Sequence, residues 1–357
     1  MSLLDHAFLR DSILLLGYPI QHSVLAANPV KKFFHRWIPN HWYRLLYAIT
    51  AALYILVAGA LWVPIPTVVY SFSGIWREIF ILIGLIGWIG YAYSHLFYYD
   101  VGGVFGTSQL FHKISGFQPP RFDFSTNGLK AYIRFPVHTF FLPMFWGTPT
   151  MTESTLLFSI VGSFYAWFGT FHHDHRYAKA FGKPYIEYQK VTGMVFPRFR
   201  RSHTNIRDSA PRREAVPSIA VLSVVLIIPA ICFAYLIAPF HKMSLSLIPL
   251  TTVLCMFIVG VFLTIFRPSL WYRADGLDAK RIEQWSFTMG VITGVYILMS
   301  YLFSYLLNHQ LPTLVAVIPT WVLGQIAGNF GCFIIARIPQ VQSQKESNWN
   351  IGFKAHT

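Results

Sequence analysis

A long uncharged segment lies at Gln284–Ala336, QWSFTMGVITGVYILMSYLFSYLLNHQLPTLVAVIPTWVLGQIAGNFGCFIIA, which holds 53 residues and no Asp, Glu, Lys or Arg. A continuous helix of this length would measure about 80 Å at ~1.5 Å per residue, whereas the hydrocarbon layer of a bilayer is ~30 Å thick. The run must therefore fold back on itself, and the segment Asn308–Pro312 supplies a polar turn with a proline stop. The stretch predicts two consecutive membrane-spanning helices.

The composition of the whole chain agrees with this interpretation. The 357 residues are 54% hydrophobic and only 12% charged, whereas a soluble globular chain carries about 25% charged residues. An Asp, Lys or Arg at the centre of a bilayer costs a few kcal/mol on insertion scales. Four more charge-free windows occur, at Leu45–Trp76, Ile79–Tyr99, Ser154–His173 and Ala215–His241. The sequence therefore predicts an all-α, polytopic membrane helix bundle.

We expect about nine transmembrane helices, and the charges of the loops predict their orientation. The expected spans are 12–28, 45–68, 79–99, 135–149, 154–173, 217–238, 245–266, 286–307 and 312–335. Every second loop is basic: the connector 174–216 holds ten Lys or Arg residues, whereas the loop 239–244 holds one. Because basic loops stay in the cytoplasm, we expect the N-terminus outside and the C-terminus in the cytoplasm, with a bacterial inner membrane as the location.

The formal charge of +14 indicates contact with lipid and not with nucleic acid. The basic residues cluster in the loops between apolar spans, which is how anionic lipid headgroups are contacted. Membrane lipids are therefore the expected partners, and nucleic-acid binding is excluded. The three cysteines, Cys232, Cys255 and Cys332, lie inside apolar segments and form neither a disulfide framework nor a zinc pattern.

The basic segment 198–216 divides the chain into two predicted membrane domains. Residues 1–197 form a five-span core rich in His, Tyr and Trp, and 198–216 is a cytoplasmic linker. Residues 217–339 form a four-span bundle that is almost purely aliphatic and aromatic, followed by a polar tail at 340–357. The core carries the polar chemistry, and the second bundle offers a surface for packing, lipid or a protein partner.

Histidines from four spans are expected at a similar depth near the cytoplasmic face. They are His22, His95, His138 and His173. Ionisable residues in membrane spans usually face the bundle interior or a wet cavity and so indicate a functional site. Two neutral imidazoles from different spans would suffice to hold a haem. The cluster in FHHDHRYAKAF (171–181) stands without a second histidine box, so a di-iron centre is not predicted.

Three segments resemble a known family. GLKAYIRFP (128–136), FWGTPTMTESTLLF (145–158) and HHDHRYAKAFGKPYIEYQKVTGMVFP (172–197) are similar to the terminal half of the isoprenylcysteine carboxyl methyltransferase-like membrane superfamily. The similarity is greatest to its branch of methanethiol S-methyltransferases and NnrU-type proteins, to which the haem protein zeta-carotene isomerase looks related. His22-Ser23, the YRLLY at 43–47 and the FGTSQL at 105–110 fit the same branch. The resemblance covers residues 12–197.

The resemblance implies a cofactor site for S-adenosylmethionine at the cytoplasmic end of the core. The family's Arg-His-Pro motif falls on Arg134, Phe135 and Pro136, and its Glu-Glu pair falls on His173 and Asp174. His138, one helical turn beyond Phe135, is a substitute for the missing imidazole. The cofactor-binding residues implied in this way are Arg134, His138, His173, Asp174, Tyr185 and Tyr188.

Three functions remain open at this point, and no catalytic residue is assigned. The first is an S-adenosylmethionine-dependent methyltransferase acting on a small thiol or a lipophilic substrate. The second is a haem-binding redox or isomerase protein in which two of the four histidines bind the iron. The third is a non-catalytic subunit of a membrane assembly, which would explain both the altered motifs and the added spans.

Overall fold

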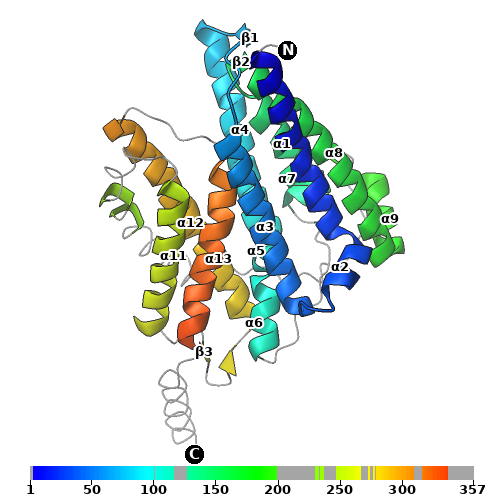
Figure 1. Ribbon diagram of the computed structural model, residues 1–357. Coiled ribbons are helices and arrows are strands. Elements are labelled where there is room, and N and C mark those ends of the chain that lie inside the picture. The colour runs from blue at the N-terminus through cyan, green and yellow to red at the C-terminus, as the bar shows by residue number, and fades with distance from the viewer. Residues whose placement is uncertain are drawn as a thin grey trace, which may run out of the picture. The chain divides into compact units, whose positions relative to one another are not determined.

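The structure, a computed structural model, is mostly helical (Figure 1). It describes residues 3–99, 101–115, 126, 128–198, 230–232, 234–236, 247–266, 272–273, 276–277, 279–308 and 316–336. The chain separates into two compact units. The first unit comprises Met1–Ile20, Leu61–Tyr99 and Arg121–Arg213, and the second comprises Gln21–Ala60, Asp100–Pro120 and Glu214–Thr357.

The two units contain the following elements. Those of the first unit, apart from the end of α1, are α1 (Leu3–Ala26), β1 (Val68–Ser71), α4 (Gly74–Tyr98), η1 (Gly128–Ala131), α7 (Pro136–Trp146), β2 (Thr150–Thr152), α8 (Glu153–Phe181) and α9 (Lys183–Val191). Those of the second unit are α2 (Asn28–Phe34), α3 (Asn40–Leu61), α5 (Val101–Phe105), α6 (Thr107–Ser115), α11 (Leu247–Phe266), β3 (Tyr272–Arg273), β4 (Gly276–Leu277), α12 (Ala279–Asn308) and α13 (Val317–Ala336). Segments 21–60 and 100–120, predicted as part of the five-span core, thus cluster with the C-terminal helices.

Among the described residues, four helices are long and apolar enough to cross a membrane. They are Asn40–Leu61, Gly74–Tyr98, Glu153–Phe181 and Trp285–Leu307. The mostly helical fold is confirmed and the four candidate spans support a membrane protein, while the count of nine spans and the orientation of the termini stay predictions. The expected span 217–238 lies largely outside the described residues.

Two departures from the expected helices have a local cause. The expected span 45–68 ends as a helix at Leu61, because Pro64 and Pro66 have no N–H for helical hydrogen bonds. The chain continues into β1, which pairs antiparallel with β2 through Tyr70–Met151 and Ser71–Thr150. The connection between α7 and α8 therefore forms part of a small two-stranded sheet.

In the first unit, α4 packs closely against α7. The contact depends on glycine: a Cβ on Gly87 would lie within 3.0 Å of the backbone of Met144, and a Cβ on Gly84 would meet the carbonyl of Gly147. Small residues let membrane helices approach each other closely. In the second unit, α11 and α13 lie side by side (Figure 1), with Gly260 against the backbone of Gly328.

Local interactions define both ends of the helix α8 and so fix where the chain turns from α8 into α9. It begins with a capping box, in which the Thr152 hydroxyl accepts from the Thr155 N–H and the Thr155 hydroxyl accepts from the Thr152 N–H. It ends at Phe181, and the residue that follows, Gly182, has a φ of 64°, which lies in the left-handed region that glycine favours. Pro184 then opens α9 in the first turn, where a missing N–H costs nothing. The chain therefore turns sharply between α8 and α9.

Candidate functional site

Backbone hydrogen bonds of the first unit place Arg134 beside the segment that follows α9. The N–H of Arg134 donates to the carbonyl of Gly193 at 2.8 Å, and the N–H of Phe135 donates to that of Met194 at 3.1 Å. Ile133 and Gly193 form an isolated parallel bridge. The start of α7 is thereby tied to the end of the motif that closes at Pro197.

Arg134 forms a bidentate ion pair with Asp174 of α8. Its Nε lies 2.9 Å from Oδ1, and its Nη2 lies 3.0 Å from Oδ2. Both side chains are largely buried, with exposed fractions of 8% and 13%. The planar guanidinium matches the two carboxylate oxygens, and this geometry gives the strongest kind of charge-assisted hydrogen bond.

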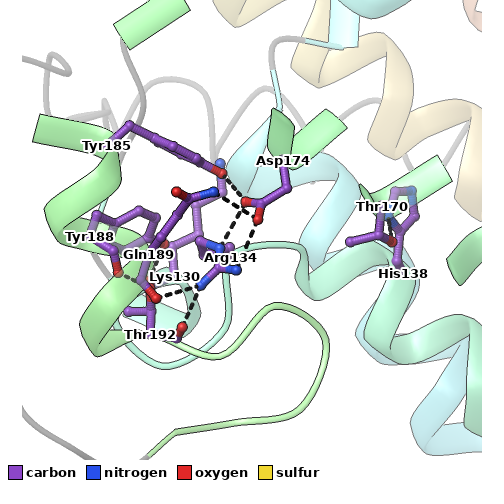
Figure 2. A network of polar contacts seen from close by, with 9 residues as sticks. All are labelled: Lys130, Arg134, His138, Thr170, Asp174, Tyr185, Tyr188, Gln189 and Thr192. Atoms are coloured by element: carbon purple, nitrogen blue, oxygen red, sulfur yellow. Dashed lines mark hydrogen bonds and ion pairs between the residues drawn. The ribbon is translucent and has the colours of Figure 1, made fainter. Parts of the chain in front are cut away.

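Further residues of α9 complete the network around this pair (Figure 2). The Tyr185 hydroxyl donates to Oδ1 of Asp174 at 2.7 Å, and the Gln189 side-chain amide donates to Oδ2 at 2.9 Å. Nη1 of Arg134 donates to the backbone carbonyls of Gln189 and Thr192. Each carboxylate oxygen thus accepts two hydrogen bonds, and four N–H groups of Arg134 are used within the protein.

The two tyrosines of α9 are buried and remain protonated over the ordinary pH range. Burial raises the pKa of Tyr185, and the hydrogen bond to the negative carboxylate of Asp174 raises it further. Burial likewise raises the pKa of Tyr188, whose hydroxyl donates to the backbone carbonyl of Lys130 in η1. Both hydroxyls therefore act as donors that connect α9 to its neighbours.

His138 lies apart from the ion-pair network, on the part of α7 that faces α8 (Figure 2). Its Nδ1 lies 2.7 Å from the hydroxyl oxygen of Thr170, and that hydroxyl donates to the carbonyl of Ala166 at 2.7 Å. Its ring stacks between Phe135 and Phe141, with interplanar angles of 13° and 16°. The imidazole is therefore held in one orientation within an aromatic environment.

Aromatic rings from α7 and α8 gather around this imidazole. The ring centroid of His173 lies 6.2 Å from that of His138 and 6.4 Å from that of Phe135. The ring centroid of Tyr177 lies 5.9 Å from that of Phe135 and 6.3 Å from that of His173. We call these four residues, Phe135, His138, His173 and Tyr177, the ring cluster.

The structure brings the sequence-predicted residues together in two groups. Arg134, Asp174 and Tyr185 share one network, with Tyr188 adjacent to it, and His138 lies near His173. That these residues hold a cofactor stays a prediction. Sequence reasoning missed Gln189, although it directly follows the matched Tyr188, and Thr170, which lies four residues before Asp174 on the same helix face.

The remaining candidate haem ligands have other surroundings. His95 stacks with Tyr91 and Tyr99 in the first unit. His22 belongs to the second unit, where its Nε2 lies 2.6 Å from the Tyr47 hydroxyl. Within the described part of the chain, no group of three or more His, Cys, Asp or Glu side chains could hold a metal ion. A haem held by two of the four histidines would not need such a group, and it stays a prediction.

Comparison with known proteins finds six relatives, all named methanethiol S-methyltransferase. The chain is 32% identical to methanethiol S-methyltransferase 2 of Bradyrhizobium diazoefficiens over 216 residues, which are 60% of this chain and 82% of that protein. It is 30% identical to the methanethiol S-methyltransferase of Pseudomonas sp. strain GM41(2012) over 193 residues, 54% of this chain and 74% of the relative. Identity to the enzyme of that name from Pseudomonas deceptionensis is 29% over 197 residues, 55% of this chain and 75% of the relative. No family model matches the chain, and no solved structure matches it.

Proposed function

The chain belongs to the family of methanethiol S-methyltransferases, and on this premise we propose that it transfers a methyl group from S-adenosylmethionine to the sulfur of a small thiol. The observation that carries the proposal is the 32% identity over 82% of the length of a relative named methanethiol S-methyltransferase 2, and S-adenosylmethionine as the methyl donor follows from the motif resemblance. The resemblance found in the motifs of residues 12–197 is of the same family. The proposed substrate class follows from the relatives' names, and methanethiol is its simplest member.

The residues of the first unit fit a sulfonium cofactor. S-adenosylmethionine supplies a methyl group on a positively charged sulfur. The faces of phenylalanine and tyrosine rings attract a cation that lies within about 6 Å of the ring centroid, and the ring cluster contains two such rings, those of Phe135 and Tyr177, with their centroids 5.9 Å apart. The carboxylate of Asp174 neutralises Arg134, so the arginine does not repel a neighbouring cation.

We assign different tasks to the two groups of residues. The Arg134–Asp174 network holds the start of α7, the end of α8 and α9 together, because its members come from all three. The ring cluster offers the surface on which cofactor and thiol meet. Catalysis of methyl transfer then consists mainly of positioning the thiol sulfur in line with the methyl carbon.

The proposed setting is a multi-pass protein of a bacterial inner membrane with the N-terminus outside and the C-terminus in the cytoplasm. A small apolar thiol partitions into the bilayer, and the site would receive it from there. The C-terminal spans, for which the motif resemblance gives no role, would bind lipid or a protein partner.

A second candidate function is a non-catalytic subunit of a membrane assembly. One observation favours it: the Arg134–Asp174 network uses its hydrogen-bonding groups within the protein. A family member that had lost cofactor binding would keep such a network for stability alone.

Binding and turnover of the purified protein test the proposal. The protein in detergent micelles is titrated with S-adenosylmethionine by calorimetry, and with methanethiol and labelled S-adenosylmethionine it is assayed for dimethyl sulfide in the headspace. We expect saturable binding and thiol-dependent product, both inhibited by S-adenosylhomocysteine. Binding without turnover of methanethiol would shift the proposal to another thiol, and neither binding nor turnover would favour the non-catalytic subunit.

A further inference from the structure

The hydrogen bonds of His138 determine which ring nitrogen carries its proton, and from this we infer that His138 is the general base that deprotonates the thiol substrate. The inference rests on the proposed function, and it gives His138 a role in the reaction itself in addition to cofactor contact. Thr170 is the positioning residue that holds the imidazole in the reactive form.

The assignment of the tautomer follows from the single proton of the Thr170 hydroxyl. Its oxygen lies 2.7 Å from the carbonyl oxygen of Ala166 and 2.7 Å from Nδ1 of His138. A carbonyl oxygen can only accept, so a contact of this length requires the hydroxyl proton to point at Ala166. The hydroxyl oxygen must then accept from His138, which places a proton on Nδ1. In the neutral imidazole, Nε2 carries the free lone pair.

The position of His138 suits a proton acceptor for a small apolar substrate. Its ring is half-buried and is stacked between Phe135 and Phe141 at centroid distances of 5.9 and 6.0 Å. The rings leave the imidazole few orientations, while Thr170, fully buried on α8, anchors its Nδ1 side. The Nε2 edge of the ring is then the edge directed away from Thr170.

The other titratable side chains around His138 come from two helices. His173 and Tyr177 belong to α8, which packs on α7. Tyr91 and His95 belong to α4, which also packs on α7. The ring of Tyr91 stacks on that of Phe141, which in turn stacks on His138, and His95 stacks on Tyr91. His173 is the competing candidate for the base. Its ring is exposed, whereas that of His138 is stacked between two rings and fixed by a buried hydroxyl.

The chemistry needs a base because the thiolate, not the thiol, is the nucleophile. A thiol with a pKa of about 8.5 is only a few per cent ionised at pH 7. In the proposed step the S–H proton moves to Nε2, and a sulfur electron pair forms the new bond to the methyl carbon. The bond between that carbon and the sulfonium sulfur breaks, and its electron pair stays on the departing sulfur. The products are a thioether, S-adenosylhomocysteine and a protonated His138, which returns its proton to water.

The decisive experiment compares thiols of different acidity in the His138→Gln variant. Glutamine has similar size and polarity but cannot take up the proton. With an alkyl thiol, kcat/KM should fall by about 10²- to 10⁴-fold, the usual contribution of general-base catalysis. With an acidic aromatic thiol, which is already ionised at neutral pH, kcat/KM should change little. Because His138 also belongs to the ring cluster, the Kd of the variant for S-adenosylmethionine is measured by calorimetry, and both thiols are assayed at a saturating concentration of S-adenosylmethionine.

Four further variants separate the role of a base from a structural role. Thr170→Val removes the acceptor for Nδ1–H, so it should also lower the rate with the alkyl thiol more than with the aromatic thiol, and Thr170→Ser should restore it. His175→Gln makes the same chemical change at an exposed position of α8 and should leave both rates unchanged. His173→Gln tests the competing base in the same pair of thiols.

The outcomes distinguish failure of this inference from failure of the proposed function. If His138→Gln slows both thiols equally while the cofactor still binds, His138 is not the base. If His173→Gln alone shows the thiol-dependent loss, the base is His173 and the inference is overturned. If the unchanged protein neither binds S-adenosylmethionine nor methylates any thiol, the proposed function itself falls.

Discussion

Arg134 and Asp174 form a bidentate ion pair, with Nε 2.9 Å from Oδ1 and Nη2 3.0 Å from Oδ2, although 40 residues separate them in the sequence. Arg134 precedes α7 and Asp174 lies in α8. The backbone carbonyls of Gln189 and Thr192 accept from the same guanidinium. One arginine therefore connects three segments of the unit that holds the ring cluster.

Removing one charge of this pair should strongly destabilise the protein. Asp174→Asn leaves Arg134 buried without a counter-charge, which costs about 3–5 kcal/mol in comparable buried pairs. The free energy of unfolding is measured by chemical denaturation in detergent micelles. Glu187→Gln is the matched control, because Glu187 pairs with Lys190 at the surface at 2.9 Å and exposed pairs contribute about 0–1 kcal/mol. Equal losses in the two variants would contradict a stabilising role for the buried network.

The buried tyrosine of this network predicts loss of stability at alkaline pH. Because burial and the Asp174 carboxylate raise the pKa of Tyr185 in the folded protein, the folded state keeps a proton that the unfolded chain loses near pH 10. Its contribution is complete below that pH, and stability should fall as the pH rises above it. The unfolding free energy of Tyr185→Phe should depend less on pH between about 9 and 11 than that of the unchanged protein. Parallel curves would show that Tyr185 does not carry the effect.

Close packing of α4 on α7 predicts opposite effects for two glycine substitutions. Gly87→Ala places a Cβ within 3.0 Å of the Met144 backbone, and overpacking of this kind typically costs about 1–3 kcal/mol. Gly59→Ala in α3 meets nothing within 4 Å and should be neutral or stabilising by up to about 1 kcal/mol, because alanine favours the helix. Thermal unfolding of both variants in the same detergent tests the difference. Similar melting temperatures would contradict the close helix contact.

The capping box of α8 predicts that Thr152→Ala lowers the free energy of unfolding more than Ser73→Ala does. Thr152→Ala removes the hydroxyl that accepts from the N–H of Thr155, and loss of such a cap typically costs about 1 kcal/mol. Ser73 stands at the same position before α4, but its side chain makes no capping hydrogen bond. Ser73→Ala should therefore cost distinctly less in denaturant titration. A reversed order would mean that the box does not stabilise the start of α8.

The helical membrane fold was predictable because charge and hydropathy are properties of composition along the chain. The bilayer excludes ionised side chains from apolar windows, so segments such as 79–99 and 154–173 are recognisable without any partner, and α4 and α8 cover them. The prolines after Leu61 shortened one expected span by a rule that is equally local. The family, too, followed from motif residues in a fixed order.

For the candidate site, the sequence predicted which residues take part but not which of them contact each other. The family resemblance placed Arg134, Asp174 and Tyr185 in separate motifs of one implied cofactor site, but only the turn at Gly182 and the hydrogen bonds to Gly193 determine that the three side chains share hydrogen bonds. The partner of His138 is Thr170, 32 residues away on another helix. Hydrogen bonds depend on distances of a few tenths of an ångström between distant segments, and no pattern along one chain encodes them. The amino-acid sequence was therefore enough to indicate a lipid environment, the apolar helices and the family. Which side chains contact each other, and which nitrogen of His138 carries the proton, follow only from the tertiary structure.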